Sequence, residues 1–368
     1  MAVSLPRPLW VEGVWISGAA LTMVGAAAQL VHPVWGGASW LAAAGVAALV
    51  VTLFWGDAGR LALDDADFGA LTWATRITVL RGLLLAILAG MACAAEATVG
   101  MGPALVFALG ALLDGADGWM ARRMGQVSRL GASLDNRYDA LALLLGSATA
   151  VRFGGAPWWY LGVGLVYYAF YGALRWRESL GGGVHREALG PSMHVRFAVG
   201  LQFVALTAAL FGGLSGALGR TVLTLLMLPI VAGFLRDWFL VCGLWQRHAG
   251  AYPRWRRRGL SLLLRWVPLP LRLGVAALSG LGLFWGPQGI FACGVLAAGA
   301  LGALLGVAPR ALALLLVGQV AVTQTALPPA WSQALAALST AIVYLGGGAW
   351  TLWNPEERWV FRRWGTPA

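Results

Sequence analysis

The sequence predicts an all-α, polytopic integral membrane protein with about twelve transmembrane helices, and three observations support this fold class. Hydrophobic residues make up 59% of the 368 positions, charged residues make up 11%, and the mean hydropathy is +0.74. A transmembrane helix needs roughly 20 consecutive apolar residues, and about a dozen stretches approach that length. These stretches also lack the alternation of apolar and polar residues that membrane β-barrels require. Most of the chain is therefore expected to lie in lipid.

Apolar runs define the predicted helices in chain order. The predicted helices lie near residues 9–31, 34–55, 78–98, 102–121, 132–151, 156–174, 196–214, 219–243, 269–286, 289–307, 309–327 and 332–353.

The charges of the connecting segments predict the orientation in the membrane. The chain carries 26 basic and 15 acidic residues, and every basic residue is arginine. If the connection Arg122–Arg129 is cytoplasmic, the other arginines fall on or near that side, except Arg152 and Arg220 outside and Arg137 within a span. This distribution follows the positive-inside rule. We therefore expect a multi-pass protein of the cell (inner) membrane with both termini cytoplasmic. The basic charge favours membrane lipids, and not nucleic acid, as its partner.

Composition divides the chain into three segments. Residues 1–67 hold two predicted helices and an acidic connector at Asp57–Asp67. Residues 68–246 hold six predicted helices and nearly all of the polar residues that fall within spans. Residues 247–368 begin with an arginine-rich linker and continue into four helices rich in glycine, alanine and leucine. Small residues allow helices to pack closely in lipid, so this last segment is expected to serve packing or interaction.

Four of the 15 acidic residues lie within 26 positions, on two segments that are otherwise apolar enough to enter the bilayer. A carboxylate at membrane depth is costly and generally marks a functional site. The first segment carries Asp114 and Asp117. Their positions share one helical stripe with Gly118, Ala121 and Arg122, because the spacing is i, i+3, i+4, i+7, i+8.

The second segment carries Asp135 and Asp139, which form a stripe with Gly131 at i, i+4, i+8 spacing. Eight residues separate Arg122 from Gly131, which is enough to fold the two helices into a hairpin whose stripes face each other. The sequence therefore predicts that four carboxylates converge near the cytoplasmic surface.

Converging carboxylates repel one another unless protons or cations neutralise them. Oxygen-rich clusters suit Mg²⁺ or Mn²⁺, which in turn bind phosphate groups. Two such ions would orient a diphosphate, while one carboxylate accepts a proton from an attacking hydroxyl. Gly118, Ala121 and Gly131 lack bulk, so a flat nucleotide base could approach the backbone there. Arg122 could hold phosphate oxygens bidentately.

This pattern resembles the signature of the CDP-alcohol phosphotransferase family, also known as CDP-alcohol phosphatidyltransferases. The signature reads D-x2-D-G-x2-A-R-x8-G-x3-D-x3-D, and every fixed position is matched between Asp114 and Asp139. The resemblance covers about residues 70–245. It implies a metal-dependent membrane enzyme whose six-helix catalytic core is the segment 68–246. Such enzymes transfer a substituted phosphate from a CDP-linked donor to an alcohol and release CMP, and a homodimer is also implied.

The resemblance implies a role for each matched position. Asp114, Asp117 and Asp135 would be metal ligands of a site for two Mg²⁺ or Mn²⁺ ions, and Asp139 would be both a ligand and the catalytic base. The CDP-binding residues would be Gly118, Ala121, Arg122, Gly131 and, upstream, Thr78.

Thr78 lies in a second matching stretch, Ala74–Arg81, which looks like the family's P-N-x-I/L-T-x-x-R entry to the first core helix. Ala74 and Thr75 stand where the family has Pro and Asn, which puts any nucleotide contact of that Asn in question here. The last four helices look faintly like the DoxX-type four-helix membrane module, through Leu271–Gly274 and the segment ending before Pro309.

The expected donor is CDP-diacylglycerol, because a site at the cytoplasmic boundary can bind a soluble head group while the acyl chains stay in lipid. The acceptor is an alcohol whose identity the sequence does not specify. A phosphorylated polyol such as glycerol phosphate or inositol phosphate fits the abundance of cytoplasmic arginine, whereas serine or a lipid alcohol would need fewer arginines. An alternative reaction transfers the head group of a soluble CDP-alcohol to diacylglycerol. A non-enzymatic alternative is a twelve-helix ion-coupled transporter, whose carboxylates would bind protons or sodium ions.

Further arginines of the core segment are candidates for pairing with carboxylates or for binding phosphate. Arg137 points away from the stripe of Asp135 and Asp139, so we expect it to pair with a carboxylate, a head group or a neighbouring helix. The candidates for holding a phosphate on the acceptor are Arg175, Arg177, Arg196 and Arg236.

Overall fold

The chain is almost entirely helical wherever its structure is described. The computed structural model describes residues 11, 13–20, 22, 36–64, 71–95, 100–125, 128–153, 155–185, 193–245, 258–259, 261–284, 289–323 and 328–355. Within these ranges the β-structure is one isolated bridge between Val307 and Trp353. The prediction of an all-α fold is confirmed for them. Both termini and most of the basic linker, which are predicted to be cytoplasmic, lie outside the described residues.

Several helices have the length and composition of membrane spans. Among the described residues these are Gly37–Gly59, Trp73–Cys93, Gly102–Arg123, Gly216–Val241 and Leu262–Gly282. They indicate a membrane protein, as the composition predicted. The expected total of about twelve spans, the six-helix core, the inner-membrane location and the orientation stay predictions.

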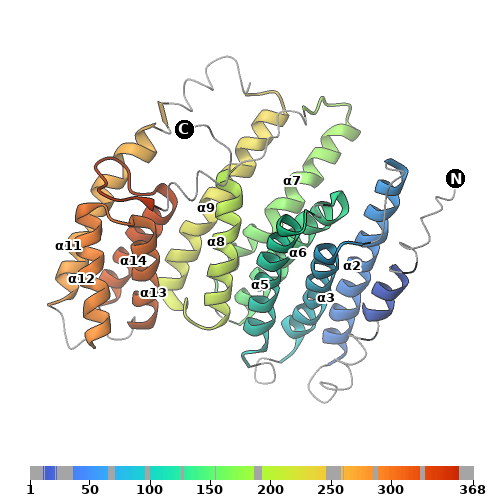
Figure 1. Cartoon of the computed structure of the whole chain (residues 1–368), viewed down its shortest axis with the longest axis horizontal. Coiled ribbons are helices and arrows are strands. Elements are labelled where there is room, and N and C mark those ends of the chain that lie inside the picture. Colours follow the sequence, from blue (N-terminus) through green and yellow to red (C-terminus); the bar gives the residue numbers. More distant parts are fainter. Residues whose placement is uncertain are drawn as a thin grey trace. The chain divides into compact units, whose positions relative to one another are not determined.

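Two compact units make up the chain. The first comprises residues 1–154, 163–165 and 206–211, and the second comprises residues 155–162, 166–205 and 212–368. The first unit contains the four helices α2 (Gly37–Asp64), α3 (Trp73–Cys93), α5 (Gly102–Arg123) and α6 (Arg129–Arg152). Helix α3 packs against α2, α5 and α6, so it is the central helix of this unit (Figure 1).

Close packing of α3 on α6 is made possible by Gly82. A Cβ atom at this position would lie 2.8 Å from the ring of Tyr138 on α6, so only glycine fits without movement. Tyr138 is fully buried, and its hydroxyl donates a hydrogen bond to the carbonyl of Val50 on α2 at 3.2 Å. Tyr138 thus connects α6 to α2. The small residue Gly82 lets α3 pack closely against the Tyr138 ring, as small residues do at helix interfaces.

The predicted start of the acidic connector at Asp57 is wrong, because residues 57–64 continue helix α2. Asp57 lies inside α2, which runs on to Asp64, and its side chain is buried. Its carboxylate lies 3.0 Å from Arg137 on α6 and accepts a hydrogen bond from Ser133 at 2.7 Å. Pairing offsets the cost of burying this charge. Arg137 therefore pairs with a carboxylate, which is one of the three partners considered for it. Residues 65–67 of the connector lie outside the described residues.

The second unit contains three helices that continue the core segment. These are α7 (Leu161–Ser179), which follows the short 3₁₀ turn η1 (Trp158–Tyr160), then α8 (Met193–Leu210) and α9 (Gly216–Val241). One turn of α7 and the end of α8 are grouped with the first unit. Phe170 and Leu174 of α7 form a buried cluster with Val241 of α9.

Four more helices of the second unit pack on one another in a closed cycle. They are α11 (Pro268–Gly282), α12 (Ile290–Leu305), α13 (Pro309–Thr323) and α14 (Pro329–Leu345), preceded by the π-helical turn η3 (Leu262–Trp266). Helix α11 contacts α12 and α14, and α13 contacts α12 and α14. Glycine supports this contact where α12 meets α13, since a Cβ at Gly299 would lie 2.7 Å from the side chain of Leu316.

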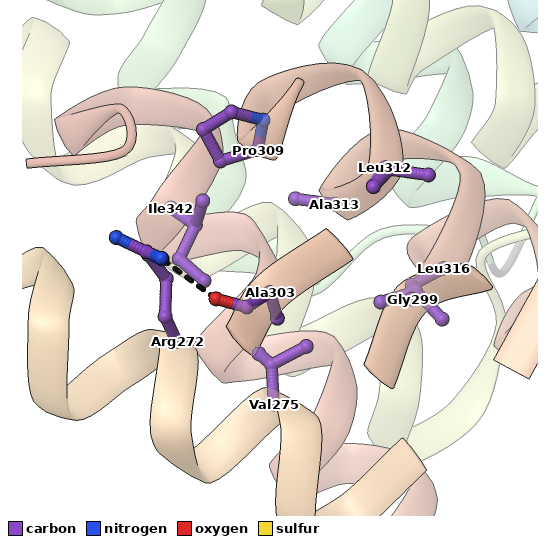
Figure 2. Close-up of a pocket in the computed structure, with 9 residues that line it drawn as sticks. All are labelled: Arg272, Val275, Gly299, Ala303, Pro309, Leu312, Ala313, Leu316 and Ile342. Atoms are coloured by element: carbon purple, nitrogen blue, oxygen red, sulfur yellow. Dashed lines mark hydrogen bonds between the residues drawn. The ribbon is translucent and has the colours of Figure 1, made fainter. Parts of the chain in front are cut away.

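Arg272 is the largest side chain that is fully buried in the described part of this four-helix group. It donates hydrogen bonds to carbonyls at the end of α12, namely Ala303 at 2.7 Å and Leu304 at 2.9 Å. Figure 2 shows its guanidinium beside the Ala303 carbonyl, at the edge of a small cavity. The cavity volume is about 10 Å³, which is about the space of one water molecule.

A buried polar network joins α14 to the helices that precede the four-helix group. The hydroxyl of Tyr344 on α14 donates to the carbonyl of Leu226 on α9 at 2.9 Å, and Gln202 on α8 donates to the same carbonyl at 2.6 Å. The Tyr160 hydroxyl in turn donates to the side-chain oxygen of Gln202. Buried polar groups need such partners. The network therefore explains why α14 packs on α9 in a defined position.

Candidate active site

Three of the four predicted aspartates converge in the first unit. Asp114 comes from the middle of α5, and Asp135 and Asp139 come from the first half of α6. Each offers a carboxylate oxygen, and these oxygens lie within 4.8 Å of one another. The side chains are partly buried. The two helical stripes expected from the spacing therefore do face each other, and their carboxylates form one acidic cluster.

Asp117 has different surroundings, although it lies one turn further along α5. It is 6% exposed, and its Oδ2 accepts a hydrogen bond of 2.7 Å from the hydroxyl of Thr78 on α3. Thr78 is buried as well and also donates to the carbonyl of Ala74. Thr78 was predicted to bind CDP, and its observed contact is with a predicted metal ligand. The hydrogen bond fixes the orientation of the Asp117 carboxylate.

Arg81 lies at the centre of the acidic cluster, although its sequence position alone predicts no role for it. Its guanidinium forms an ion pair with Asp114, lies 2.7 Å from Asp135 Oδ1 and lies 3.1 Å from Asp139 Oδ1. The residue is 2% exposed. A signal for it was present, because Arg81 stands three positions after Thr78 at the last fixed position of the P-N-x-I/L-T-x-x-R stretch. An arginine within a predicted span also calls for a buried partner.

Hydroxyl groups join the beginnings of α3 and α6. Thr72 caps α3 and accepts a hydrogen bond from the backbone N–H of Thr75 at 3.2 Å, while Ser128 caps α6 and accepts one from Gly131 at 3.0 Å. The Thr75 hydroxyl lies 2.9 Å from the hydroxyl of Thr72 and 2.9 Å from that of Ser128. Side-chain caps of this kind stabilise helix starts. Thr75, which replaces the family's Asn, therefore aligns the two helices that carry Thr78, Asp135 and Asp139.

Gly131 is enclosed by this hydroxyl chain. A Cβ at position 131 would lie 2.8 Å from Ser128 Oγ and 2.9 Å from Thr75 Oγ1, closer than unbonded atoms normally approach. A larger residue would therefore displace at least one of these two hydroxyls. The close approach of the Ser128 and Thr75 hydroxyls is thus a packing reason for a small residue at position 131, in addition to the predicted approach of a nucleotide.

The remaining predicted CDP-binding residues lie near the end of α5. A Cβ at Gly118 would lie 3.2 Å from a guanidinium nitrogen of Arg122, so that exposed side chain folds back over the glycine. Ala121 is half-buried on the same helix. The structure thus brings Gly118 and Arg122 together on the stripe that carries Asp114 and Asp117.

We expect Gly131→Ala to lower CMP release about ten- to hundredfold, because small displacements of reacting groups have effects of this size. The added methyl group would push apart the caps that align α3 and α6. The matched control is Gly115→Ala on α5, where a Cβ meets no atom within 4 Å. Initial rates of both variants at equal folded concentration test this expectation, and a fully active Gly131→Ala enzyme would contradict it.

The four arginines proposed to bind the acceptor belong to the second unit. Arg175 and Arg177 lie near the end of α7, and Arg177 donates to the carbonyl of Gly183 at 3.1 Å. Arg196 is exposed near the start of α8. Arg236 donates to its neighbour Asp237 at 2.9 Å. A role for these residues in acceptor binding stays a prediction.

Comparison with known proteins agrees with the signature. A family model described as CDP-alcohol phosphatidyltransferase matches residues 71–245, which include Thr78, Arg81 and all four aspartates. Searches of curated proteins and of solved structures found no match. The matched residues end before the four-helix group α11 to α14, and they begin after α2. Residues 71–245 therefore match the CDP-alcohol phosphatidyltransferase family, and the candidate spans among the described residues indicate a membrane protein.

Proposed function

We propose that this protein transfers a phosphatidyl group from CDP-diacylglycerol to an alcohol and releases CMP. The observation that carries the proposal is the cluster of Asp114, Asp135 and Asp139 within a domain of this family. Phosphatidyl transfer requires groups that bind a diphosphate and a base that accepts a proton from a hydroxyl. The residues of the first unit offer both kinds of group. The product would be a phospholipid.

The acidic cluster fits divalent metal ions. Three carboxylates with oxygens within 4.8 Å of one another are a suitable donor set for Mg²⁺ or Mn²⁺, which prefer oxygen ligands. Asp139 Oδ1 is buried and accepts no well-aligned hydrogen bond from the described residues, so it has capacity for a further ligand. Asp114, Asp135 and Asp139 would hold the ions, with Asp117 beside them, and two ions are expected. Bound metal would supply positive charge that offsets the charge of the donor diphosphate.

The protein residues would then divide the remaining work. Arg122 would bind phosphate oxygens of the CDP group, and Gly118 would leave space for that group next to the helix. The Asp139 carboxylate would accept the proton of the acceptor hydroxyl. The acceptor oxygen forms a bond to the β-phosphorus, and the bond from that phosphorus to the bridging oxygen breaks. CMP leaves with the bridging oxygen.

The acceptor would be a phosphorylated polyol such as glycerol phosphate or inositol phosphate. The arginines of α7, α8 and α9 favour an acceptor of this charge, because Arg binds phosphate bidentately. Serine or a lipid alcohol would need fewer such residues. The reverse arrangement, in which a soluble CDP-alcohol reacts with diacylglycerol, uses the same groups and is distinguished by the substrate test below.

Purified protein in detergent or vesicles should release CMP from CDP-diacylglycerol when Mg²⁺ or Mn²⁺ and an acceptor are both present. Chelation with EDTA should reduce the rate to background, and added metal should restore it. A panel of acceptors followed by mass spectrometry of the lipid product identifies the acceptor. CMP release that continues at full rate without divalent metal would refute the mechanism, and product formation only from a soluble CDP-alcohol and diacylglycerol would establish the reverse arrangement.

A further inference from the structure

The guanidinium of Arg81 occupies the place between the carboxylates that are proposed to hold metal. It contacts Asp114 on α5 and both Asp135 and Asp139 on α6. Its Nη2 also lies 3.4 Å from the backbone carbonyl of Asp135. One side chain from α3 thus reaches three carboxylates on two other helices.

Charge explains why such a contact is needed. Asp117 and the three clustered aspartates bring several negative charges into a helix bundle, and Asp117 is itself buried. Uncompensated charges in such surroundings destabilise a fold strongly, while paired ones do not. Arg81 is 2% exposed, and its guanidinium supplies compensating positive charge before any ion arrives.

The same three carboxylates cannot satisfy a guanidinium and two divalent ions in full. Asp114, Asp135 and Asp139 make up the candidate metal group, and each of them contacts Arg81. A metal ion attracts a carboxylate more strongly than a guanidinium does, because it carries twice the charge at a shorter distance. Metal binding should therefore draw at least one carboxylate away from Arg81.

We propose that Arg81 is the resident counter-ion of the metal-free site, which keeps the carboxylates together and competes with the incoming metal for them. Arg81 is then a positioning residue that acts through Asp114, Asp135 and Asp139. The inference rests on the proposed function, because it takes these aspartates to be metal ligands. It adds that the metal-free fold and the metal affinity depend on this arginine in opposite directions.

The first test measures thermal unfolding of Arg81→Gln in EDTA and in Mn²⁺. The variant should unfold at a lower temperature than the wild type in EDTA, and Mn²⁺ should raise its unfolding temperature more than that of the wild type. The matched control is Arg76→Gln, an exposed arginine on the same helix, which should respond to Mn²⁺ as the wild type does. Equal stabilisation by Mn²⁺ in Arg81→Gln and the wild type would overturn the proposal.

The second test measures Mn²⁺ affinity directly, by titration with detection of free Mn²⁺ by electron paramagnetic resonance. Arg81→Gln should bind Mn²⁺ at least about tenfold more tightly than the wild type, because a competing positive charge is removed. Arg81→Lys keeps the charge and should stay close to the wild type. Unchanged or weaker binding by Arg81→Gln would show that Arg81 is a permanent scaffold for the metal site, which contradicts the proposal.

A third variant covers the case in which Arg81→Gln does not fold in EDTA. The double variant Arg81→Gln with Asp114→Asn removes both members of one ion pair and should recover folding without metal. Failure of the double variant to fold, with or without Mn²⁺, would overturn the counter-ion role. CMP release by the wild type is measured separately. If the wild type releases no CMP while the variants give the expected Mn²⁺ results, only the proposed reaction is refuted. If CMP release is normal and Arg81→Gln binds Mn²⁺ as the wild type does, only the inference about Arg81 is refuted.

Discussion

Asp139→Asn is expected to lower CMP release by at least about a hundredfold, which is the range for loss of a general base. An amide has nearly the shape of a carboxylate but cannot accept the proton of the acceptor hydroxyl at neutral pH. The exchange also removes one of the three carboxylates that converge around Arg81. Because Asp139 lies on a regular part of α6, the helix itself should be unaffected.

Two measurements separate a chemical defect from loss of binding or folding. Binding of CDP-diacylglycerol to Asp139→Asn should remain measurable, since Arg122 and the other aspartates are intact. The matched control is Glu178→Gln, which makes the same exchange of carboxylate for amide at an exposed position on α7 and should keep its activity. Turnover of Asp139→Asn near the wild-type rate would refute the assignment of Asp139 as the base.

The acidic cluster could be predicted because its information is local. Asp114, Asp135 and Asp139 lie on two consecutive helices, and the 3.6-residue period places the members of each stripe on one face. The short connection between the helices then leaves few ways to arrange the stripes other than face to face. This is why a single stretch of sequence was enough to predict that carboxylates of α5 and α6 converge.

The contacts of Arg81, Thr78 and Asp57 depend on helices that are distant in sequence. Arg81 reaches residues 33 to 58 positions away, and Arg137, the partner of Asp57, is 80 positions away. No periodicity within α3 or α2 identifies these partners, because they are determined by which helices pack together. The density of acidic residues after Asp57 also suggested a loop, whereas α2 continues to Asp64.

The four-helix group at the end of the chain shows a further limit of composition. Its small residues predicted close packing, and Gly299 is an example of such packing. Composition did not indicate that the few charged residues present are buried. Arg272 and Arg310 are both buried, and both donate to carbonyls near helix ends. Arg310 donates to Val343 at 2.6 Å, near the end of α14. Such a use of arginine appears only when the helix ends are placed in space.

Arg272→Met is expected to destabilise the protein by on the order of 3 kcal/mol or more, because several buried carbonyls lose their donor at once. The last four carbonyls of a helix have no partner within it. At the end of α12 the carbonyls of Gly302 and Leu305 accept from backbone N–H groups, and those of Ala303 and Leu304 accept from Arg272. Arg272 also donates at 3.1 to 3.2 Å to carbonyls that follow α14, which are those of Gly347, Ala349 and Trp350.

Methionine would fill much of the same space but could not donate to any of these carbonyls. Unpaired carbonyls are especially costly where water is scarce, as in the interior of a membrane. Gly306 limits relaxation of the site, because it adopts φ = 67° and a Cβ there would lie 2.6 Å from the Arg272 guanidinium. The loop after α12 is therefore built around the arginine, and methionine leaves it without its central contact.

Thermal unfolding in detergent, followed by circular dichroism, tests this expectation. Arg272→Met should unfold at a temperature lower by roughly 5 °C or more. The matched control is Arg265→Met, which removes an exposed arginine from the adjoining turn η3 and should change the unfolding temperature little. If both variants unfold at the wild-type temperature, the carbonyls of α12 and of the segment after α14 must find other donors, and Arg272 does not hold these two segments together.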